Sequence, residues 1–172
     1  MLEDVVDLVE AMREVDAALV VPAGADSTIR SVAWPGMAVL EVPAPAGAVA
    51  MLDAIATLGA AEGTVVAPDA PDLPALLLGK LHSALTSAQV AVCPAEDGRL
   101  VALAARPPVA DWLRDSGVSL DDDDAVRRLR AAAPRRTLLV GPGWRRVRSR
   151  DDAMRIDPGL EGWEATRALL GR

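Results

Sequence analysis

Residues 63–105 read GTVVAPDAPDLPALLLGKLHSALTSAQVAVCPAEDGRLVALAA, and this stretch decides the predicted fold. The apolar runs 63–69 and 89–95 are short, as buried strands are, and the first of them ends in Asp69. Residues 73–85 lie between them and have helical length, with Pro74 tolerated in the first helical turn. The stretch therefore begins as a strand, a helix and a second strand.

A third apolar run, residues 99–105, follows the second strand after a short polar break. Glu96, Asp97 and Gly98 form this break, and Asp-Gly is a common signal for a tight turn between strands. The sequence therefore predicts a hairpin here.

The same alternation continues on both sides of this stretch. Further strands are predicted at residues 17–22, 37–43 and 136–141, with a short edge strand at 145–149. Helices are predicted at residues 2–15, 25–32, 48–58, 108–114, 125–132 and 161–170. Alternating strands and helices imply one α/β domain over residues 1–172, with a mostly parallel sheet and helices on both faces.

The composition narrows the class of protein. The chain has no Phe and no Tyr, so the stacking platforms of single-strand nucleic-acid binders are nearly absent. Cys93 is the only cysteine, which excludes an internal disulfide and favours a reducing, cytoplasmic location. No apolar run approaches the ~20 residues that span a bilayer, and the acidic N-terminus is not that of a signal peptide.

Charge is distributed unevenly along the chain. Residues 1–126 contain 20 acids and 6 bases, whereas residues 127–172 contain 12 bases and 5 acids. Nine arginines and no acid lie between Arg127 and Arg150. Such a stretch either holds a phosphate-bearing ligand or pairs with the protein's own acids, and we favour self-pairing. The acidic body makes nucleic acid an unlikely partner.

Carboxylates at strand ends are the first candidate site. Ligands of open α/β sheets sit at the carboxyl ends of the strands, where Asp69 and Asp72 are expected. Their oxygens suit Mg²⁺ or Mn²⁺, with substrate phosphates completing the coordination shell. The alternative for Asp72 is a structural one, as the N-cap of the helix predicted to begin at Leu73.

The hairpin residues Glu96, Asp97 and Gly98 are the second candidate site, and a merely polar turn is the alternative. His82 has no Cys or His partner at metal spacing, so we expect a surface or half-buried histidine. Cys93 lies in an apolar strand and is expected to be an inert thiol of the core.

Two stretches carry a family resemblance: VVAPDAPDLPALLLGKLHSAL (65–85) and QVAVCPAEDGRLVALAARP (89–107). They resemble nucleotide-sugar-transferase-like proteins associated with radical-SAM/selenodomain systems, which are related to molybdenum-cofactor and phospholactate guanylyltransferases. The resemblance implies a glycosyltransferase-A fold, Mg²⁺ or Mn²⁺, and a nucleotide or nucleotide-sugar ligand. It assigns Asp69 to the metal and places Asp72, Glu96, Asp97 and Gly98 in the site.

The first departure from that family is at the N-terminus, where Met1 is expected to follow the point at which the family's first segment ends. The family begins with a central strand and a Gly-rich basic loop that cradles phosphates. Neither is found here, and PAGADSTIR (22–30) contains a single Gly and a single Arg. The loss of that strand is expected to be repaired by direct pairing of its neighbours, by a changed register of the sheet, or by a second chain. An exposed strand edge would favour the last of these, a homodimer.

The second departure is at residues 144–152, WRRVRSRDD, where the family motif resembles W-x-D-V-D-T-P-E-D. Arg146 and Arg148 replace both aspartates, so a cation would be repelled there. The two arginines could instead clamp a phosphate. The family's GGYY also becomes Gly98 followed by Arg-Leu-Val, which loses aromatic contacts to the acceptor.

These departures leave three hypotheses. The first is a degenerate, catalytically inactive transferase-like protein that retains nucleotide or phosphosugar binding. The second is an active metal-dependent nucleotidyl- or glycosyltransferase, which needs another carboxylate beside Asp69. The third is that a segment upstream of Met1 is missing from the chain.

Overall fold

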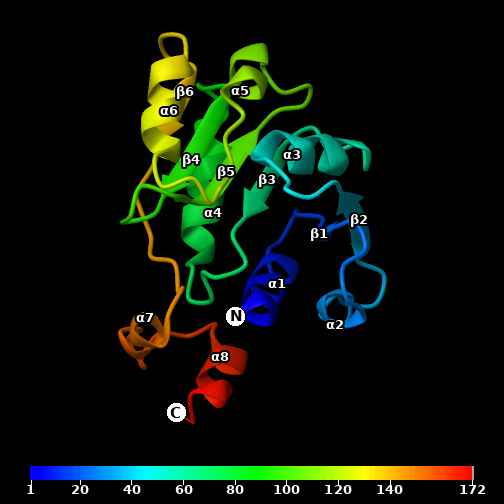
Figure 1. The fold of residues 1–172 in the computed structure, drawn as a ribbon, viewed down its shortest axis with the longest axis vertical. Helices are drawn as coiled ribbons and strands as arrows, with labels where there is room; N and C mark the ends of the chain where they lie inside the picture. The colour runs from blue at the N-terminus through cyan, green and yellow to red at the C-terminus, as the bar shows by residue number, and fades with distance from the viewer. Residues whose placement is uncertain (172) are drawn as a thin grey trace.

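The computed structural model describes residues 1–171 and has the α/β architecture that the sequence predicts (Figure 1). Its strands are β1 (Ala18–Pro22), β2 (Ala38–Val42), β3 (Gly63–Val66), β4 (Val90–Pro94), β5 (Leu100–Ala105) and β6 (Leu138–Val140). Its helices are α1 (Leu2–Glu10), α2 (Ser27–Arg30), α3 (Ala48–Ala56), α4 (Ala75–Ala84), α5 (Asp111–Ser116), α6 (Ala125–Ala132), α7 (Arg150–Met154) and α8 (Glu164–Leu169).

The larger sheet has the strand order β3-β5-β4-β6, and its strand β5 runs antiparallel to both of its neighbours. β5 follows β4 through the Asp97-Gly98 turn and inserts between β4 and β3, while β6 adds to β4 in parallel. The prediction of a mostly parallel sheet is therefore not confirmed. The sheet is mixed because a tight turn can join only antiparallel strands.

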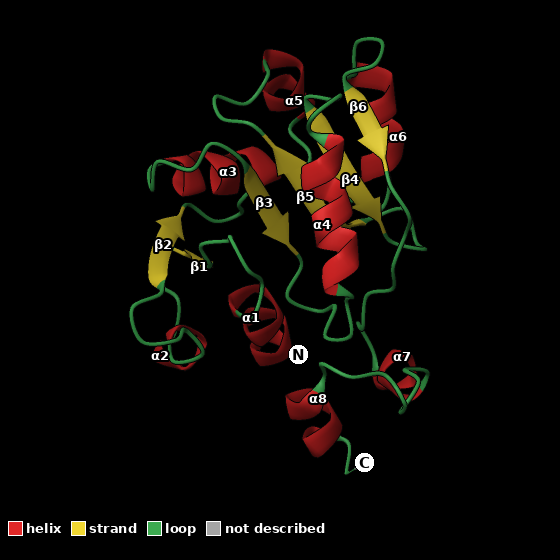
Figure 2. Cartoon of the chain, turned by 180° about the vertical axis from the view of Figure 1, so that it is seen from behind, coloured by secondary structure: helices red, strands yellow, loops and turns green. Residues whose placement is uncertain are grey.

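Helices cover both faces of this sheet, as predicted. α4 lies in front of β4 and β5 in Figure 2 and behind them in Figure 1, whereas α3, α5 and α6 pack on the opposite face. Leu103 of β5 packs on the α3 side with Leu52 and Leu129, and Ala104 packs on the α4 side with Leu81. Every residue of β5 is buried, because β5 has a neighbouring strand on each side and helices above and below.

β1 and β2 pair in parallel as a separate two-stranded sheet. Leu19 and Val21 of β1 pack against Val6 of α1 in a small core of their own. Within residues 1–171, neither β1 nor β3 has a second strand partner. A cavity of about 740 Å³ lies between these two strands.

The C-terminal helices form a small unit at the end of the molecule where both termini lie (Figure 1). Trp163 is fully buried there, together with Val147 and Ile156. Asp4 of α1 is 2% exposed and accepts hydrogen bonds from the backbone N–H and the hydroxyl of Thr166, at 3.1 and 2.5 Å. This buried carboxylate ties α8 to the N-terminal helix.

One local prediction is wrong, and one helix was not predicted. Residues 145–149 form no strand, and only an isolated bridge joins Trp144 to Ala95 after β4. α7 was not predicted, although Ser149 and Asp152 form the capping box that begins it. Within residues 1–171, no helix combines the length and apolar character needed to cross a bilayer.

Candidate functional site

The candidate site lies where β3 and β4 of the larger sheet end. Three segments meet there: the loop after β3, the β4–β5 hairpin and residues 144–148. We call this end of the sheet the strand-end edge. The last segment crosses this edge and is fixed to it through its backbone. The Trp144 N–H donates to the Pro94 carbonyl oxygen at 2.9 Å, and the Val147 N–H donates to the Asp69 carbonyl oxygen at 2.6 Å. These bonds place the side chains between Trp144 and Val147 directly beside the end of β3.

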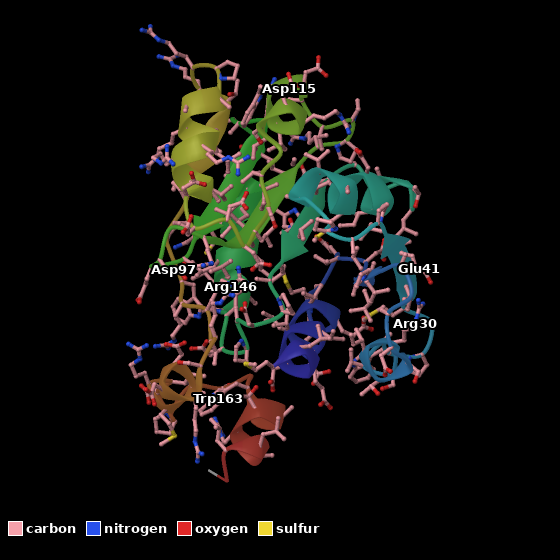
Figure 3. All side chains as sticks on the ribbon, viewed as in Figure 1. Arg30, Glu41, Asp97, Asp115, Arg146 and Trp163 are labelled. Carbon is pink, nitrogen blue, oxygen red and sulfur yellow. The ribbon has the colours of Figure 1, made fainter. Side chains whose placement is uncertain are left out.

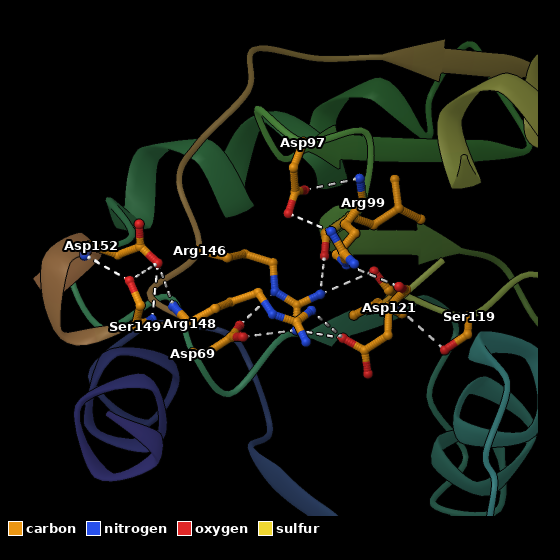
Figure 4. Close-up of polar contacts among 11 residues, drawn as sticks. Asp69, Asp97, Arg99, Ser119, Asp121, Arg146, Arg148, Ser149 and Asp152 are labelled. Atoms are coloured by element: carbon orange, nitrogen blue, oxygen red, sulfur yellow. Dashed lines mark hydrogen bonds and ion pairs between the residues drawn. The ribbon is translucent and has the colours of Figure 1, made fainter. Parts of the chain in front are cut away.

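Arg146 and Asp69 form a bidentate ion pair at the centre of this edge (Figure 4). Arg146 Nε lies 2.6 Å from Asp69 Oδ1, and Nη2 lies 3.0 Å from Oδ2. The side chains of Arg146 and Asp69 are 5% and 19% exposed, so the pair is largely removed from water. Figure 3 shows Arg146 and Asp97 at this edge.

Arg146 also holds the loop that carries Asp121. Its Nη2 donates to Asp121 Oδ1 at 2.7 Å, and its Nη1 donates to the carbonyl oxygens of Leu120 at 3.0 Å and Leu100 at 3.3 Å. A guanidinium has five N–H donors, and here each has a protein acceptor. Burial by itself would lower the pKa of Arg146, but the hydrogen bonds and charges of Asp69 and Asp121 outweigh burial and raise it.

Arg148 lies on the solvent side of the same cluster. Its side chain is 45% exposed, and its closest charged contact is Asp121 Oδ1 at 3.6 Å. Asp97 pairs with Arg99 at 2.7 Å, and the Arg99 Nε donates to the Asp121 carbonyl oxygen at 3.0 Å. Burial would raise the pKa of Asp97, but the bonds and charge of Arg99 lower it below its ordinary value.

Asp72 lies beside this cluster with a different partner. Its carboxylate is fully buried and accepts from Trp144 Nε1 at 3.2 Å and from Arg145 Nε at 2.8 Å. The structural alternative from the sequence is wrong in its detail, because α4 begins only at Ala75, with Pro74 at the N-cap position and no side-chain cap. Asp72 therefore anchors the crossing segment and does not cap the helix.

Of the three hairpin residues, Gly98 has a structural role, and Glu96 and Asp97 are exposed. Gly98 has φ +87°, and a Cβ at this position would lie 2.2 Å from the Asp123 carbonyl oxygen. Only glycine allows the hairpin to approach the backbone of Asp123 so closely. Glu96 is exposed and forms no ion pair with any residue in the described range 1–171.

Sequence reasoning did not single out Asp121, although it bridges Arg146 and Arg148. The only signal was the acidic run from Asp121 to Asp124 close to an arginine-rich segment of opposite charge. The preference for self-pairing agrees with the structure for five of the nine arginines, which are Arg127, Arg128, Arg145, Arg146 and Arg148.

His82 and Cys93 lie away from this cluster. His82 is half-buried on α4, with Nδ1 3.2 Å from Glu62 Oε2 and Nε2 3.2 Å from Thr64 Oγ1. Cys93 is 1% exposed, and burial raises the pKa of its thiol to about 11. The thiolate is therefore nearly unpopulated at neutral pH, as expected of an inert thiol of the core.

The site residues do not fit a divalent cation. Both carboxylate oxygens of Asp69 accept from the Arg146 guanidinium, so a metal ion bound to Asp69 would have to displace these hydrogen bonds. Across residues 1–171, no three His, Cys, Asp or Glu side chains are grouped so that they could hold a metal ion. Arg146 thus acts as a built-in cation for Asp69.

The chain has a fold similar to that of a nucleotide-diphospho-sugar-transferase-like protein. One similar crystal structure is that of a Desulfovibrio desulfuricans G20 protein, provisionally assigned as a nucleotide-diphospho-sugar transferase. The match has a TM-score of 0.63 at 18% identity and covers 99% of this chain and 81% of the other. At this identity the likeness establishes the fold alone. No protein-family model and no curated protein matches the chain.

Proposed function

We propose that this chain is a nucleotide-diphospho-sugar-transferase-like protein that has lost metal-dependent catalysis and retains binding of a nucleotide or a phosphosugar. The observation that supports the proposal most is the Arg146–Asp69 pair. Asp69 is the residue to which the family resemblance assigns the metal, and both of its carboxylate oxygens are engaged.

Electrostatics supports the loss of catalysis. Transfer from a nucleotide donor needs the charge of the phosphates and of the leaving group to be neutralised, usually by a divalent ion held by carboxylates. To free Asp69, a metal ion would have to displace the buried Arg146 guanidinium and leave its donors without acceptors. Breaking a buried pair in this way costs about 3–5 kcal/mol, and Arg148 would add repulsion.

The chain is proposed to retain ligand binding at the strand-end edge. Arg146 is committed to protein acceptors, so it holds Asp69 and Asp121 in place and does not face a phosphate directly. Arg148 is 45% exposed and has only its 3.6 Å contact to Asp121, which leaves guanidinium donors for a phosphate. Glu96 and Asp97 at the same edge would accept from sugar hydroxyls. The proposal includes the cytoplasmic location expected from the sequence.

A thermal-shift experiment on the purified chain tests this function. Nucleoside triphosphates and nucleotide sugars are added with and without Mn²⁺, to the wild type, to Arg148→Ala, and to Arg127→Ala as a control. Arg127 lies on α6 and is 78% exposed. Ligand at 100 times its Kd stabilises by about 2.7 kcal/mol, which corresponds to a Tm rise of roughly 5–10 °C.

We expect a rise that does not need Mn²⁺, that is lost in Arg148→Ala and that is kept in Arg127→Ala. A rise seen only with Mn²⁺, or turnover of any donor by the wild type, would favour the competing function of an active transferase. The absence of a shift with every ligand would remove the binding part of the proposal.

A further inference from the structure

β1 and β3 (Figure 2) are both edge strands of their sheets. Residues of both strands line the same cavity of about 740 Å³. Ala18 and Val20 contribute to it from β1, and Thr64 and Val66 contribute to it from β3. An open strand edge carries backbone N–H and C=O groups that can bind a further strand. The cavity therefore has two such edges, one on each side.

Hydrogen-bond alternation shows which groups of β3 are free for such pairing. The Ala67 N–H donates to the Val101 carbonyl oxygen at 2.8 Å, which continues the antiparallel ladder with β5. In such a ladder, successive residues point their backbone groups alternately at the partner strand and away from it. Val65 points at β5 like Ala67, so Thr64 and Val66 direct their N–H and C=O groups away from β5.

β1 also has backbone groups that are free for pairing on one side. The Ala23 N–H donates to the Val42 carbonyl oxygen at 2.8 Å, which continues the parallel ladder with β2. Val21 and Leu19 therefore point at β2, whereas Ala18 and Val20 direct their backbone groups away from it. Both edges thus present backbone donors and acceptors on the cavity side.

The size and lining of the cavity suit a strand. Apolar side chains line it from α1 (Val9), the turn after α1 (Met12), α3 (Met51, Ile55) and α4 (Leu78). A strand residue between sheet neighbours and covering layers takes about 4.8 by 10 by 3.3 Å, or roughly 160 Å³. The cavity of about 740 Å³ then holds about four or five residues, close to the lengths of β3 and β1.

We propose that this cavity binds an extended apolar segment of another polypeptide, which adds as a strand between β1 and β3. A peptide backbone is the occupant because it satisfies two rows of N–H and C=O groups at once, which a small apolar molecule cannot do. The side chains of the bound segment are aliphatic on both faces, because α1 and α4 cover one face of the cavity and α3 covers the other.

Charge complementarity specifies the flanks of this segment. Glu14 and Asp16 line the cavity, are exposed, and form no ion pair with other residues of the described range 1–171. A Lys or Arg flanking the apolar residues would meet them. Asp121 and Arg146 also line the cavity, so an inserted strand would reach the candidate site.

Binding is measured by fluorescence anisotropy of a labelled peptide in which five alternating Val and Leu residues lie between lysine pairs. The full chain is compared with Val66→Pro and Val20→Pro. Each substitution removes an N–H from the cavity edge without removing a ladder bond to β5 or β2. We expect each to weaken binding about tenfold or more. Val140→Pro is the control. The Gly141 N–H points at β4, so the N–H of the neighbouring Val140 lies on the outer edge of β6, away from the cavity.

Amide hydrogen exchange gives a second readout. Peptide binding should slow exchange of the Val20, Thr64 and Val66 amides by at least about tenfold, and this readout carries the test if a proline variant is unfolded by circular dichroism. Equal binding to Val66→Pro and Val140→Pro, unchanged exchange, or equal binding of a peptide with a central proline would overturn the proposal. Self-association of the peptide-free chain that Val66→Pro abolishes would assign the cavity to a second copy, and would also overturn it.

Discussion

Replacement of Arg146 by alanine is expected to lower the free energy of unfolding by about 3 kcal/mol. Removal of one member of a buried ion pair typically costs 3–5 kcal/mol, because the other charge stays buried without a partner. Here Asp69 would keep a carboxylate that is only 19% exposed, and the Leu100 and Leu120 carbonyls would lose their donors. The partial exposure of Asp69 and the greater exposure of Asp121 place the estimate at the lower end of that range.

Urea unfolding of the wild type, Arg146→Ala, Asp69→Ala and the double variant measures this effect. A loss of about 3 kcal/mol corresponds to a Tm decrease of roughly 6–12 °C in a chain of this size. The double variant should be more stable than the sum of the single losses implies, with a coupling energy of about 2 kcal/mol. Arg148→Ala is the control and should change stability by less than about 0.5 kcal/mol. A loss below about 1 kcal/mol for Arg146→Ala, or the absence of coupling, would refute the reasoning that the pair locks this edge.

Three further predictions concern other positions. Burial raises the pKa of the Cys93 thiol to about 11 in the folded chain, compared with about 8.5 in the unfolded chain. The buried neutral thiol therefore contributes fully to stability below the unfolded pKa. This contribution is lost as pH rises through the folded pKa. Stability should therefore fall by at most about 1.4 kcal/mol per pH unit in that window, and Cys93→Ala should remove this dependence in urea titrations. Gly98→Ala should lower the free energy of unfolding by about 1–3 kcal/mol, because φ is +87° and the added methyl would meet the Asp123 carbonyl oxygen. An unchanged Tm would contradict this close approach. Asp4→Ala should lower the free energy of unfolding by about 2–3 kcal/mol, because Thr166 loses its buried acceptor. It should also expose the segment after residue 150 to protease, and a segment that stays resistant would contradict this role of Asp4.

Much of the fold was readable from local patterns. The helix predicted at residues 125–132 is observed with the same bounds, and the strands at 17–22, 37–43 and 89–95 are each observed within about a residue at either end. The Asp97-Gly98 turn was readable because it needs a residue with positive φ, which Gly98 supplies. Such features depend on neighbours in the chain, which the sequence displays directly.

The candidate site was readable in part. The sequence placed Asp69 and Asp97 at strand ends, and the family resemblance alone placed Arg146 and Arg148 at the same site. It did not bring Asp121 to Arg146, since these residues are 25 positions apart and no periodic pattern links them. Nor did it show that Asp72 pairs with Arg145.

The sequence by itself determined the elements, their alternation and the charge reversal at Arg146 and Arg148, because these follow from local propensity and residue type. Only the tertiary structure decided that β5 inserts between β3 and β4, that each donor of Arg146 has a protein acceptor, and that β1 and β3 leave a cavity between them. These outcomes depend on which edges and side chains meet in space, and the distances that set those energies do not exist until the chain has folded.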